Sequence, residues 1–134
     1  RPPVSTPPTS PSACSWVNCT PDHPLCFEGD GLSYFRVPVV DEQSAELLPH
    51  LPDAVAFVWD ALDVGGVVLL HCKHGQSRSA AVAAACLMSR RGWTALRSLE
   101  HLKACRPRVR PNPGFLRQLE EFGRTLAPQH ASSK

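Results

Sequence analysis

Short apolar runs separated by polar, turn-forming segments are the first pattern along this chain. The strongest run is 67–70, which consists of four Val and Leu residues. Two earlier segments, 13–20 and 32–40, are rich in aromatic and β-branched residues. Each pattern is typical of a short β-strand. Pro38 marks the end of its strand, because proline cannot donate a ladder hydrogen bond.

Between and after these runs, apolar residues recur at the spacing of an amphipathic helix. The expected helices are 52–62, 79–91, 95–105 and 113–126. Asp41 or Ser44 is placed to cap the first, Gly92 ends the second, and Thr94 caps the third. Asn112, followed by proline, caps the last. The helix at 95–105 should carry Leu96, Leu99 and Leu102 on one face. The buried stripe of the helix at 113–126 should be Phe115, Leu116, Leu119 and Phe122.

Strands that alternate with helices predict an α/β domain: a small, largely parallel sheet flanked by helices. We expect this domain over residues 13–127. Residues 1–12 include five prolines and almost no apolar residues, so they predict a disordered tail that cannot bury enough surface to fold. Residues 128–134 predict a second, polar tail.

Composition narrows the class of protein. The chain has 134 residues, 43% of them apolar, and a formal net charge of +2. Such a small charge does not indicate a nucleic-acid-binding protein, and no apolar run reaches the length of a membrane span. The six cysteines show no repeated spacing, which favours a reducing compartment, the cytoplasm or alternatively the nucleus.

The segment that joins the 67–70 strand to the next helix carries the candidate chemistry. Backbone N–H groups converge in a tight loop before a helix N-terminus, and such a loop binds anions. A thiol there, Cys72, ionises easily, and the planar fork of Arg78 suits two phosphate oxygens. The candidate phosphate-binding residues are Lys73, His74, Gly75, Gln76, Ser77 and Arg78. The alternative for a cysteine is a buried structural thiol, which is our interpretation of Cys14, Cys19, Cys86 and Cys105.

His71-Cys72, five further residues, then Arg78-Ser79 resembles the signature loop of the cysteine-dependent protein tyrosine phosphatases. The Ser-Arg-Ser run at 77–79 is similar to the dual-specificity branch of that family. Segments 17–20, 34–41 and 106–119 resemble other parts of the family domain in the same order. Family members usually have a further strand pair and a helix before the strand at 17–20, so we expect an N-terminally abbreviated version of the fold.

The resemblance implies a two-step phosphoryl transfer through a cysteinyl-phosphate on Cys72. Arg78 and the loop N–H groups would stabilise the phosphoryl oxygens, and Ser79 would hydrogen-bond the departing sulfur. The general acid would be Asp41, at the end of the 32–40 strand, with Glu42 as the substitute. The resemblance implies no metal ion and no cofactor.

The sequence leaves more than one class of substrate open. The resemblance implies hydrolysis of phosphotyrosine and phosphoserine or phosphothreonine in phosphorylated proteins, with no nucleic-acid partner expected. Positive charge at Lys73 and His74 leaves a phosphoinositide or an RNA 5′-phosphate as alternatives. An inactive phospho-binding scaffold is a third interpretation, although it has no chemical need for Cys72, Arg78 and Asp41 together.

Overall fold

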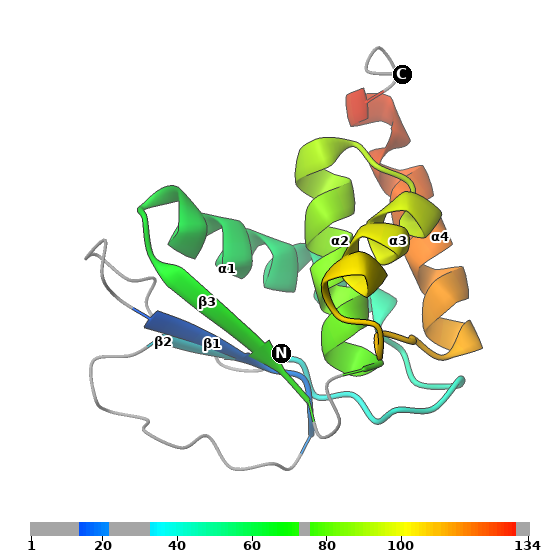
Figure 1. Cartoon of the computed structure of the whole chain (residues 1–134), viewed down its shortest axis with the longest axis horizontal. Coiled ribbons are helices and arrows are strands. Elements are labelled where there is room, and N and C mark those ends of the chain that lie inside the picture. The colour runs from blue at the N-terminus through cyan, green and yellow to red at the C-terminus, as the bar shows by residue number, and fades with distance from the viewer. Residues whose placement is uncertain (1–13, 22–32, 73–75, 131–134) are drawn as a thin grey trace.

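The computed structural model describes residues 14–21, 33–72 and 76–130 (Figure 1). Within them the strands are β1 (Cys14–Asn18), β2 (Ser33–Arg36) and β3 (Val67–His71). The helices are the 3-10 turn η1 (Leu48–His50), α1 (Leu51–Asp63), α2 (Arg78–Arg91), α3 (Ala95–Cys105) and α4 (Pro113–His130). The predicted order of strands and helices is therefore confirmed.

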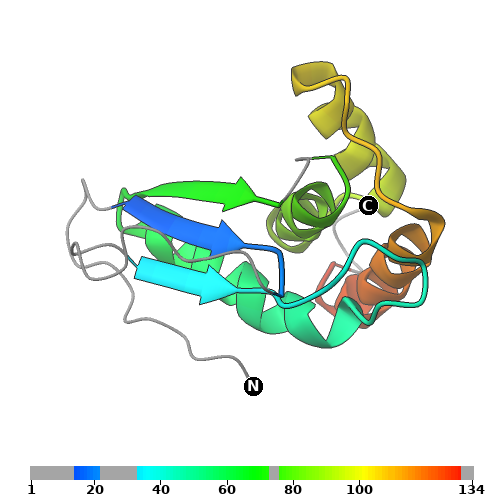
Figure 2. The same ribbon diagram turned by 90° about the horizontal axis from the view of Figure 1, so that it is seen from below.

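The three strands form one parallel sheet in the order β2-β1-β3. Trp16 on β1 lies opposite Tyr34 on one side and Leu69 on the other. Helix α1 runs along one face of this sheet, while α2, α3 and α4 gather beside the carboxyl ends of the strands (Figures 1 and 2). The α/β class and the parallel sheet expected from sequence are confirmed.

The core forms between the sheet, α1 and the central helix α2. Val17 and Phe35 are neighbours in register and are fully or almost fully buried, and the Phe35 ring stacks on Phe57 of α1 at 5.4 Å. Helix α2 is buried along most of its length, and its many alanines allow the neighbouring helices to approach closely. Phe115 and Leu119 complete the core from α4.

Three of the four predictions of residues that cap or end a helix are confirmed. Gly92 adopts φ 70° after α2, Thr94 Oγ1 accepts a hydrogen bond from Arg97 N at 3.1 Å, and Asn112 Oδ1 accepts one from Phe115 N at 2.9 Å. The fourth prediction was wrong, because neither Asp41 nor Ser44 caps η1 or α1. That cap comes from a distant residue described below.

One predicted stripe residue and one boundary were also wrong. Leu116, expected in the buried stripe of α4, is 36% exposed, and Leu96 on α3 is 69% exposed, because each helix packs against its neighbours along a narrower stripe than its leucines suggest. Helix α4 continues to His130 rather than ending near residue 126.

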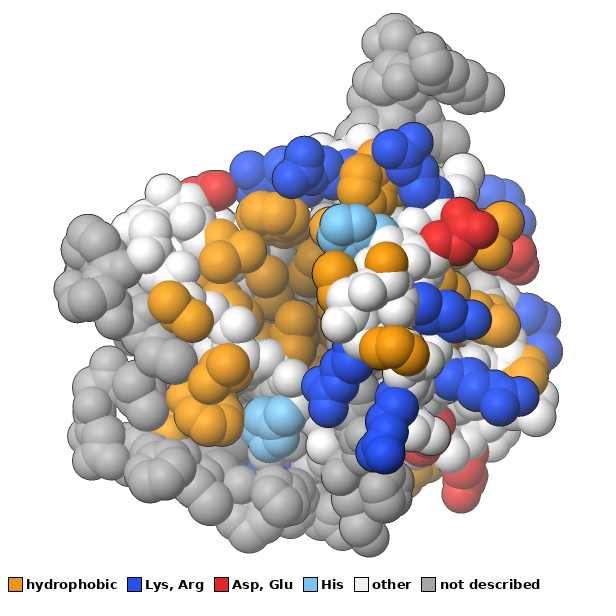
Figure 3. All heavy atoms as spheres, viewed as in Figure 1, with side chains coloured by type: hydrophobic (Ala, Val, Ile, Leu, Met, Phe, Trp, Pro, Cys, Tyr) orange, Lys and Arg blue, Asp and Glu red, His pale blue; other side chains and the backbone are white. Residues whose placement is uncertain are grey.

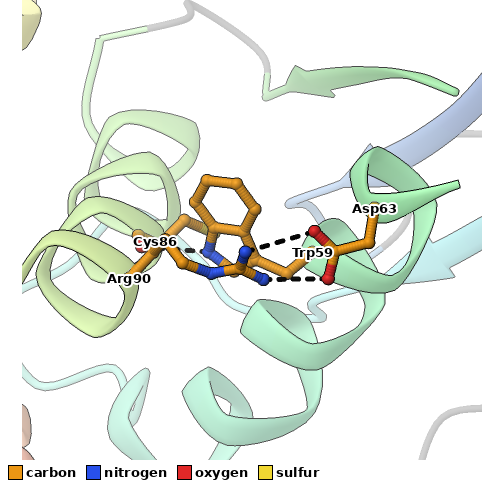
Figure 4. A network of polar contacts seen from close by, with 4 residues as sticks. All are labelled: Trp59, Asp63, Cys86 and Arg90. Carbon is orange, nitrogen blue, oxygen red and sulfur yellow. Dashed lines mark hydrogen bonds and ion pairs between the residues drawn. The ribbon is translucent and has the colours of Figure 1, made fainter. Parts of the chain in front are cut away.

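A cluster of side chains joins the ends of α1 and α2 (Figure 4). The Arg90 guanidinium lies 4.1 Å from the centre of the Trp59 ring and forms an ion pair with Asp63 at 3.0 Å. Trp59 Nε1 donates a hydrogen bond to the Cys86 carbonyl at 3.0 Å. The ion pair is exposed and contributes little by itself, so the stacked tryptophan provides most of this link.

Some predictions concern residues that the structure does not describe. The tail at 1–12 and the loop residues Lys73, His74 and Gly75 lie outside the described ranges. Within the described ranges, no helix is both long and apolar enough to cross a membrane.

Candidate active site

Cys72 lies where β3 ends and just before α2 begins. The Ser79 hydroxyl is 3.2 Å from Cys72 Sγ, and the Ser79 backbone N–H points at the same sulfur from 3.5 Å. The predicted contact between these two side chains is present. A sulfur that faces a hydroxyl, a backbone N–H and the first turn of a helix is stabilised in its thiolate form.

Arg78 is buried at the start of α2, with 8% of its surface exposed. Its Nη1 donates a hydrogen bond to the Val39 carbonyl at 3.0 Å. This bond fixes the guanidinium between the helix that follows Cys72 and the segment that leads to Asp41. Guanidinium carries five N–H donors, so one can hold the side chain while others bind phosphate oxygens.

Asp41 contacts the loop between β3 and α2, which we call the catalytic loop after its predicted role. Asp41 Oδ1 accepts hydrogen bonds from Ser77 Oγ at 2.7 Å and from Asn112 Nδ2 at 2.9 Å. Asn112 N also donates to Ser77 Oγ at 3.1 Å. The three residues form a closed triangle that joins the Asp41 loop, the catalytic loop and the start of α4. The Asp41 carboxylate is nevertheless exposed, so it remains accessible to a substrate.

Two of the candidate phosphate-binding residues also tie the loop to the rest of the domain. The Ser77 hydroxyl belongs to the triangle just described, and the Gln76 carbonyl accepts a hydrogen bond from Arg110 N at 2.6 Å. The groups of these two residues that could bind a phosphate are their backbone N–H groups, because N–H groups at the start of a helix lack intrahelical partners.

Sequence reasoning did not assign a role to Gln118, which holds the other end of the Asp41 loop. Its Oε1 accepts hydrogen bonds from Leu47 N at 2.7 Å and Leu48 N at 2.8 Å, and its Nε2 donates to the Ala45 carbonyl at 2.8 Å. Gln118 thus supplies the cap of η1 that was expected from Asp41 or Ser44.

Gly114, one helical turn before Gln118, allows this loop to approach α4. A Cβ atom at this position would overlap the backbone carbonyl of Gln43. Asn112, Gly114 and Gln118 all lie in segments that resemble the family, but their spacing alone does not show that they face the Asp41 loop.

The remaining cysteines differ from Cys72 in their surroundings. Burial raises the pKa of the Cys19 thiol far above its usual value, and the nearby Cys72 raises it further. Burial also raises the pKa of the Cys86 thiol, to about 12. Both thiols stay neutral at physiological pH, as structural cysteines do. Cys105, which we expected to be buried as well, is exposed, because it ends α3 at the surface.

Within the described parts of the chain, no group of three or more His, Cys, Asp or Glu residues is arranged to hold a metal ion. The polar groups of the site are the Arg78 guanidinium, the hydroxyl groups of Ser77 and Ser79, the Asp41 carboxylate and backbone N–H donors.

The comparisons with known proteins agree on one family. Residues 14–125 match the model of the dual specificity phosphatase catalytic domain. The chain is 45% identical over 106 residues to protein phosphatase Slingshot homolog 3 of Rattus norvegicus, covering 79% of this chain and 16% of that protein. It is 41% identical over 99 residues to dual specificity phosphatase 28 of Homo sapiens, covering 74% of this chain and 56% of that protein.

Solved structures agree with the sequence matches. The crystal structure of human DUSP28 has a TM-score of 0.80 and 36% identity, covering 86% of this chain and 77% of that one. A mouse putative dual specificity phosphatase complexed with zinc tungstate has a TM-score of 0.82 and 38% identity, covering 88% and 74%. The chain thus corresponds to a small part of the Slingshot protein and little more than half of the human dual specificity phosphatase 28 sequence.

Proposed function

The chain belongs to the dual specificity phosphatase catalytic-domain family, and from this premise we propose that it hydrolyses phosphate monoesters on tyrosine and on serine or threonine side chains of proteins. The observation that carries the proposal is the set of contacts that ties the Asp41 segment to the loop between β3 and α2. Cys72 Sγ contacts the Ser79 hydroxyl, buried Arg78 donates to the Val39 carbonyl two residues before Asp41, and Asp41 accepts a hydrogen bond from Ser77 of that loop.

In the first step, the Cys72 thiolate attacks phosphorus and the bond from phosphorus to the ester oxygen breaks. Arg78 and the N–H groups at the start of α2 stabilise charge on the equatorial oxygens. Asp41, protonated, gives its proton to the leaving oxygen. The products are a cysteinyl-phosphate and the dephosphorylated side chain.

In the second step, water attacks the cysteinyl-phosphate and the bond between phosphorus and sulfur breaks. Asp41, now a carboxylate, accepts the proton from water, so that it is ready for the next cycle. The Ser79 hydroxyl, 3.2 Å from Sγ, donates to the sulfur as it regains negative charge. Inorganic phosphate leaves, and the thiolate is restored.

The thiolate chemistry requires that Cys72 stays reduced, and we extend the proposal to location on that ground. We place the protein in a reducing compartment, the cytoplasm or the nucleus. Localisation of the tagged full-length protein by fluorescence microscopy tests this, and secretion would contradict it.

The test of the proposed reaction is hydrolysis of two aryl phosphates across pH, one with a good and one with a poor leaving group. In the presence of a chelator, we expect turnover by the parent and none above background by Cys72→Ser. Asp41→Asn should slow the poor leaving group by about 10²–10⁴-fold. It should slow the good leaving group far less, because a stable phenoxide does not need the proton.

The matched control is Asp63→Asn, which makes the same change in an exposed carboxylate on α1 and should leave both rates as in the parent. Turnover by Cys72→Ser would contradict the cysteinyl-phosphate route. A folded parent that binds phosphopeptides but hydrolyses neither aryl phosphate would instead establish the scaffold interpretation.

A further inference from the structure

Positive charge is concentrated in one part of the chain. Residues 90–110 hold seven of the 14 Lys and Arg residues and one of the 12 Asp and Glu residues. Figure 3 shows Lys and Arg side chains over the helical part of the molecule, while apolar side chains gather over β3. The net charge of +2 conceals this separation.

Three of these seven cations have structural partners. Arg90 pairs with Asp63, and the guanidinium groups of Arg91 and Arg97 lie 5.9 and 4.5 Å from the centre of the Trp93 ring. These contacts lie around the end of α2 and the start of α3. They account for part of the basic surface without any ligand.

Arg106, Arg108 and Arg110 are different, and we call the segment 106–110 the basic arm. All three are exposed. With residues 14–21, 33–72 and 76–130, the part of the chain that the structure describes, their side chains form no ion pair and no contact with an aromatic ring. Their charges therefore face solvent with no carboxylate from these residues to neutralise them.

The backbone of the basic arm is fixed beside the catalytic loop. Arg110 N donates to the Gln76 carbonyl at 2.6 Å, and Val109 N donates to the Arg106 carbonyl at 3.1 Å, which closes a turn. Val109 is 6% exposed and anchors that turn in the core. The arm is held by its main chain and by one apolar side chain, so its arginine side chains are not needed to maintain the fold.

A second segment beside the catalytic loop has the opposite charge. We call residues 42–46 the acidic arm, because Glu42 and Glu46 are both exposed there. The two arms are linked where Asn112, two residues after the basic arm, donates a hydrogen bond at 2.9 Å to Asp41, the residue before the acidic arm. From there they run on two sides of the start of α2 (Figure 2). A chain that delivers a phosphorylated side chain to Cys72 meets positive charge on one side and negative charge on the other.

We propose that the basic arm selects phosphorylated protein segments that carry acidic residues on one side of the phosphorylated residue. The acidic arm disfavours acidic residues on the other side. Opposite charges at contact distance are attracted and like charges repelled in a way that fixes register and orientation as well as affinity. This inference rests on the proposed phosphatase function and specifies its substrate class.

The test uses three phosphotyrosine peptides of one length: one with three acidic residues before the phosphotyrosine, one with three after it, and one neutral. The two acidic isomers have the same net charge, so long-range attraction to the protein is equal for both. We expect kcat/KM of the parent to differ about tenfold between the isomers, with the neutral peptide between them. The difference should shrink as salt is raised, because salt screens exposed charges.

The variant is Arg108→Gln/Arg110→Gln, in which the difference between isomers should fall to within about twofold. The control is Arg91→Gln/Arg124→Gln, which removes the same charge from exposed positions about 16 Å or more along their helices from the ends near the catalytic loop. The control should keep the parental difference. General damage to the fold lowers kcat/KM for all three peptides together, so the ratio between isomers separates the two causes.

Equal kcat/KM for the two acidic isomers would overturn the inference, as would an unchanged ratio in Arg108→Gln/Arg110→Gln. Faster hydrolysis of a phosphatidylinositol phosphate in vesicles than of any peptide would overturn it in favour of a lipid substrate. If the parent hydrolyses small aryl phosphates but shows no preference among peptides, the inference alone fails. If it hydrolyses none of these compounds, the proposed function fails and the inference fails with it.

Discussion

The carboxyl end of β3 and its outer edge, the side away from β1, differ in how they are held. At its carboxyl end, side chains from the Asp41 loop, the catalytic loop and α4 are joined by hydrogen bonds of 2.7–3.1 Å. Along its outer edge, β3 has no neighbouring strand among the described residues, and Val67 and Leu69 are 56% and 43% exposed. Figure 3 shows apolar side chains over this part of the surface.

At these two places of β3, the fixed geometry of side chains and the burial of apolar area are separate properties. Hydrogen bonds at the carboxyl end join the Asp41 carboxylate to Ser77, in the loop that follows Cys72, and to Asn112, with little apolar burial. The loss of one of these bonds should therefore change activity. The outer edge contributes apolar surface without fixing any group. The predictions below test this separation.

The largest effect is expected for Gln118→Ala at the carboxyl end. The change leaves two N–H groups and one carbonyl of the Asp41 loop without their partner, which costs about 2–3 kcal/mol of unfolding free energy. Because Asp41 is then less firmly placed, kcat/KM for a poor leaving group should fall about tenfold or more, a loss of about 1.4 kcal/mol or more in transition-state stabilisation.

Urea unfolding and steady-state kinetics measure the two effects of Gln118→Ala. Gln43→Ala is the control, because Gln43 is an exposed residue of the same loop, and neither quantity should change by more than about 0.5 kcal/mol. Lower stability with unchanged kinetics in Gln118→Ala would show that α4 supports the loop without positioning Asp41.

An intermediate effect on the free energy of unfolding is expected from the buried thiol of Cys86, which lies in the core. The pKa of the Cys86 thiol is about 12 in the folded chain, against an ordinary value of 9.0. Between these values the unfolded chain loses this proton and the folded chain keeps it. The free energy of unfolding should therefore fall with rising pH above 9, by about 1.4 kcal/mol per pH unit from this thiol.

Urea titrations at pH 8, 9 and 10 in reductant compare the parent with Cys86→Ala and Cys105→Ala. The slope above pH 9 should be smaller in Cys86→Ala. It should be as in the parent in Cys105→Ala, because that thiol is exposed. Equal slopes in all three proteins would show that Cys86 ionises as freely in the folded chain as in the unfolded one.

The smallest effect is expected at the outer edge, for Leu69→Thr. Leu69 is 43% exposed, so the change should cost about 1 kcal/mol or less and leave kcat/KM as in the parent. Leu70→Thr is the matched comparison, because Leu70 is next in the same strand but packs against the core. It should cost about 2 kcal/mol or more.

Denaturant unfolding measures both edge variants under one set of conditions. A loss of 2 kcal/mol or more in Leu69→Thr would contradict the contrast, since it would mean that the outer edge is buried in solution by contacts absent from the fold described above.

The sequence by itself determined the local parts of this protein. The strand, loop and helix around Cys72 and Arg78 follow from patterns within about fifteen residues, as do the caps at Thr94 and Asn112. The contact between Ser79 and the Cys72 sulfur followed from the family resemblance of the same loop. Local patterns succeed because they report the conformational preferences of neighbouring residues.

Only the tertiary structure decided which distant residues meet. The bonds from Asn112 to Asp41 and from Gln118 to the loop at 45–48 join segments about seventy residues apart, and nothing in either segment alone specifies the other. The exposure of Leu96 was decided in the same way, because burial depends on which neighbour covers a helix face. The candidate reacting groups could be identified from short stretches of sequence. Their positions relative to one another depend on packing, because packing brings remote backbone and side chains within hydrogen-bonding distance.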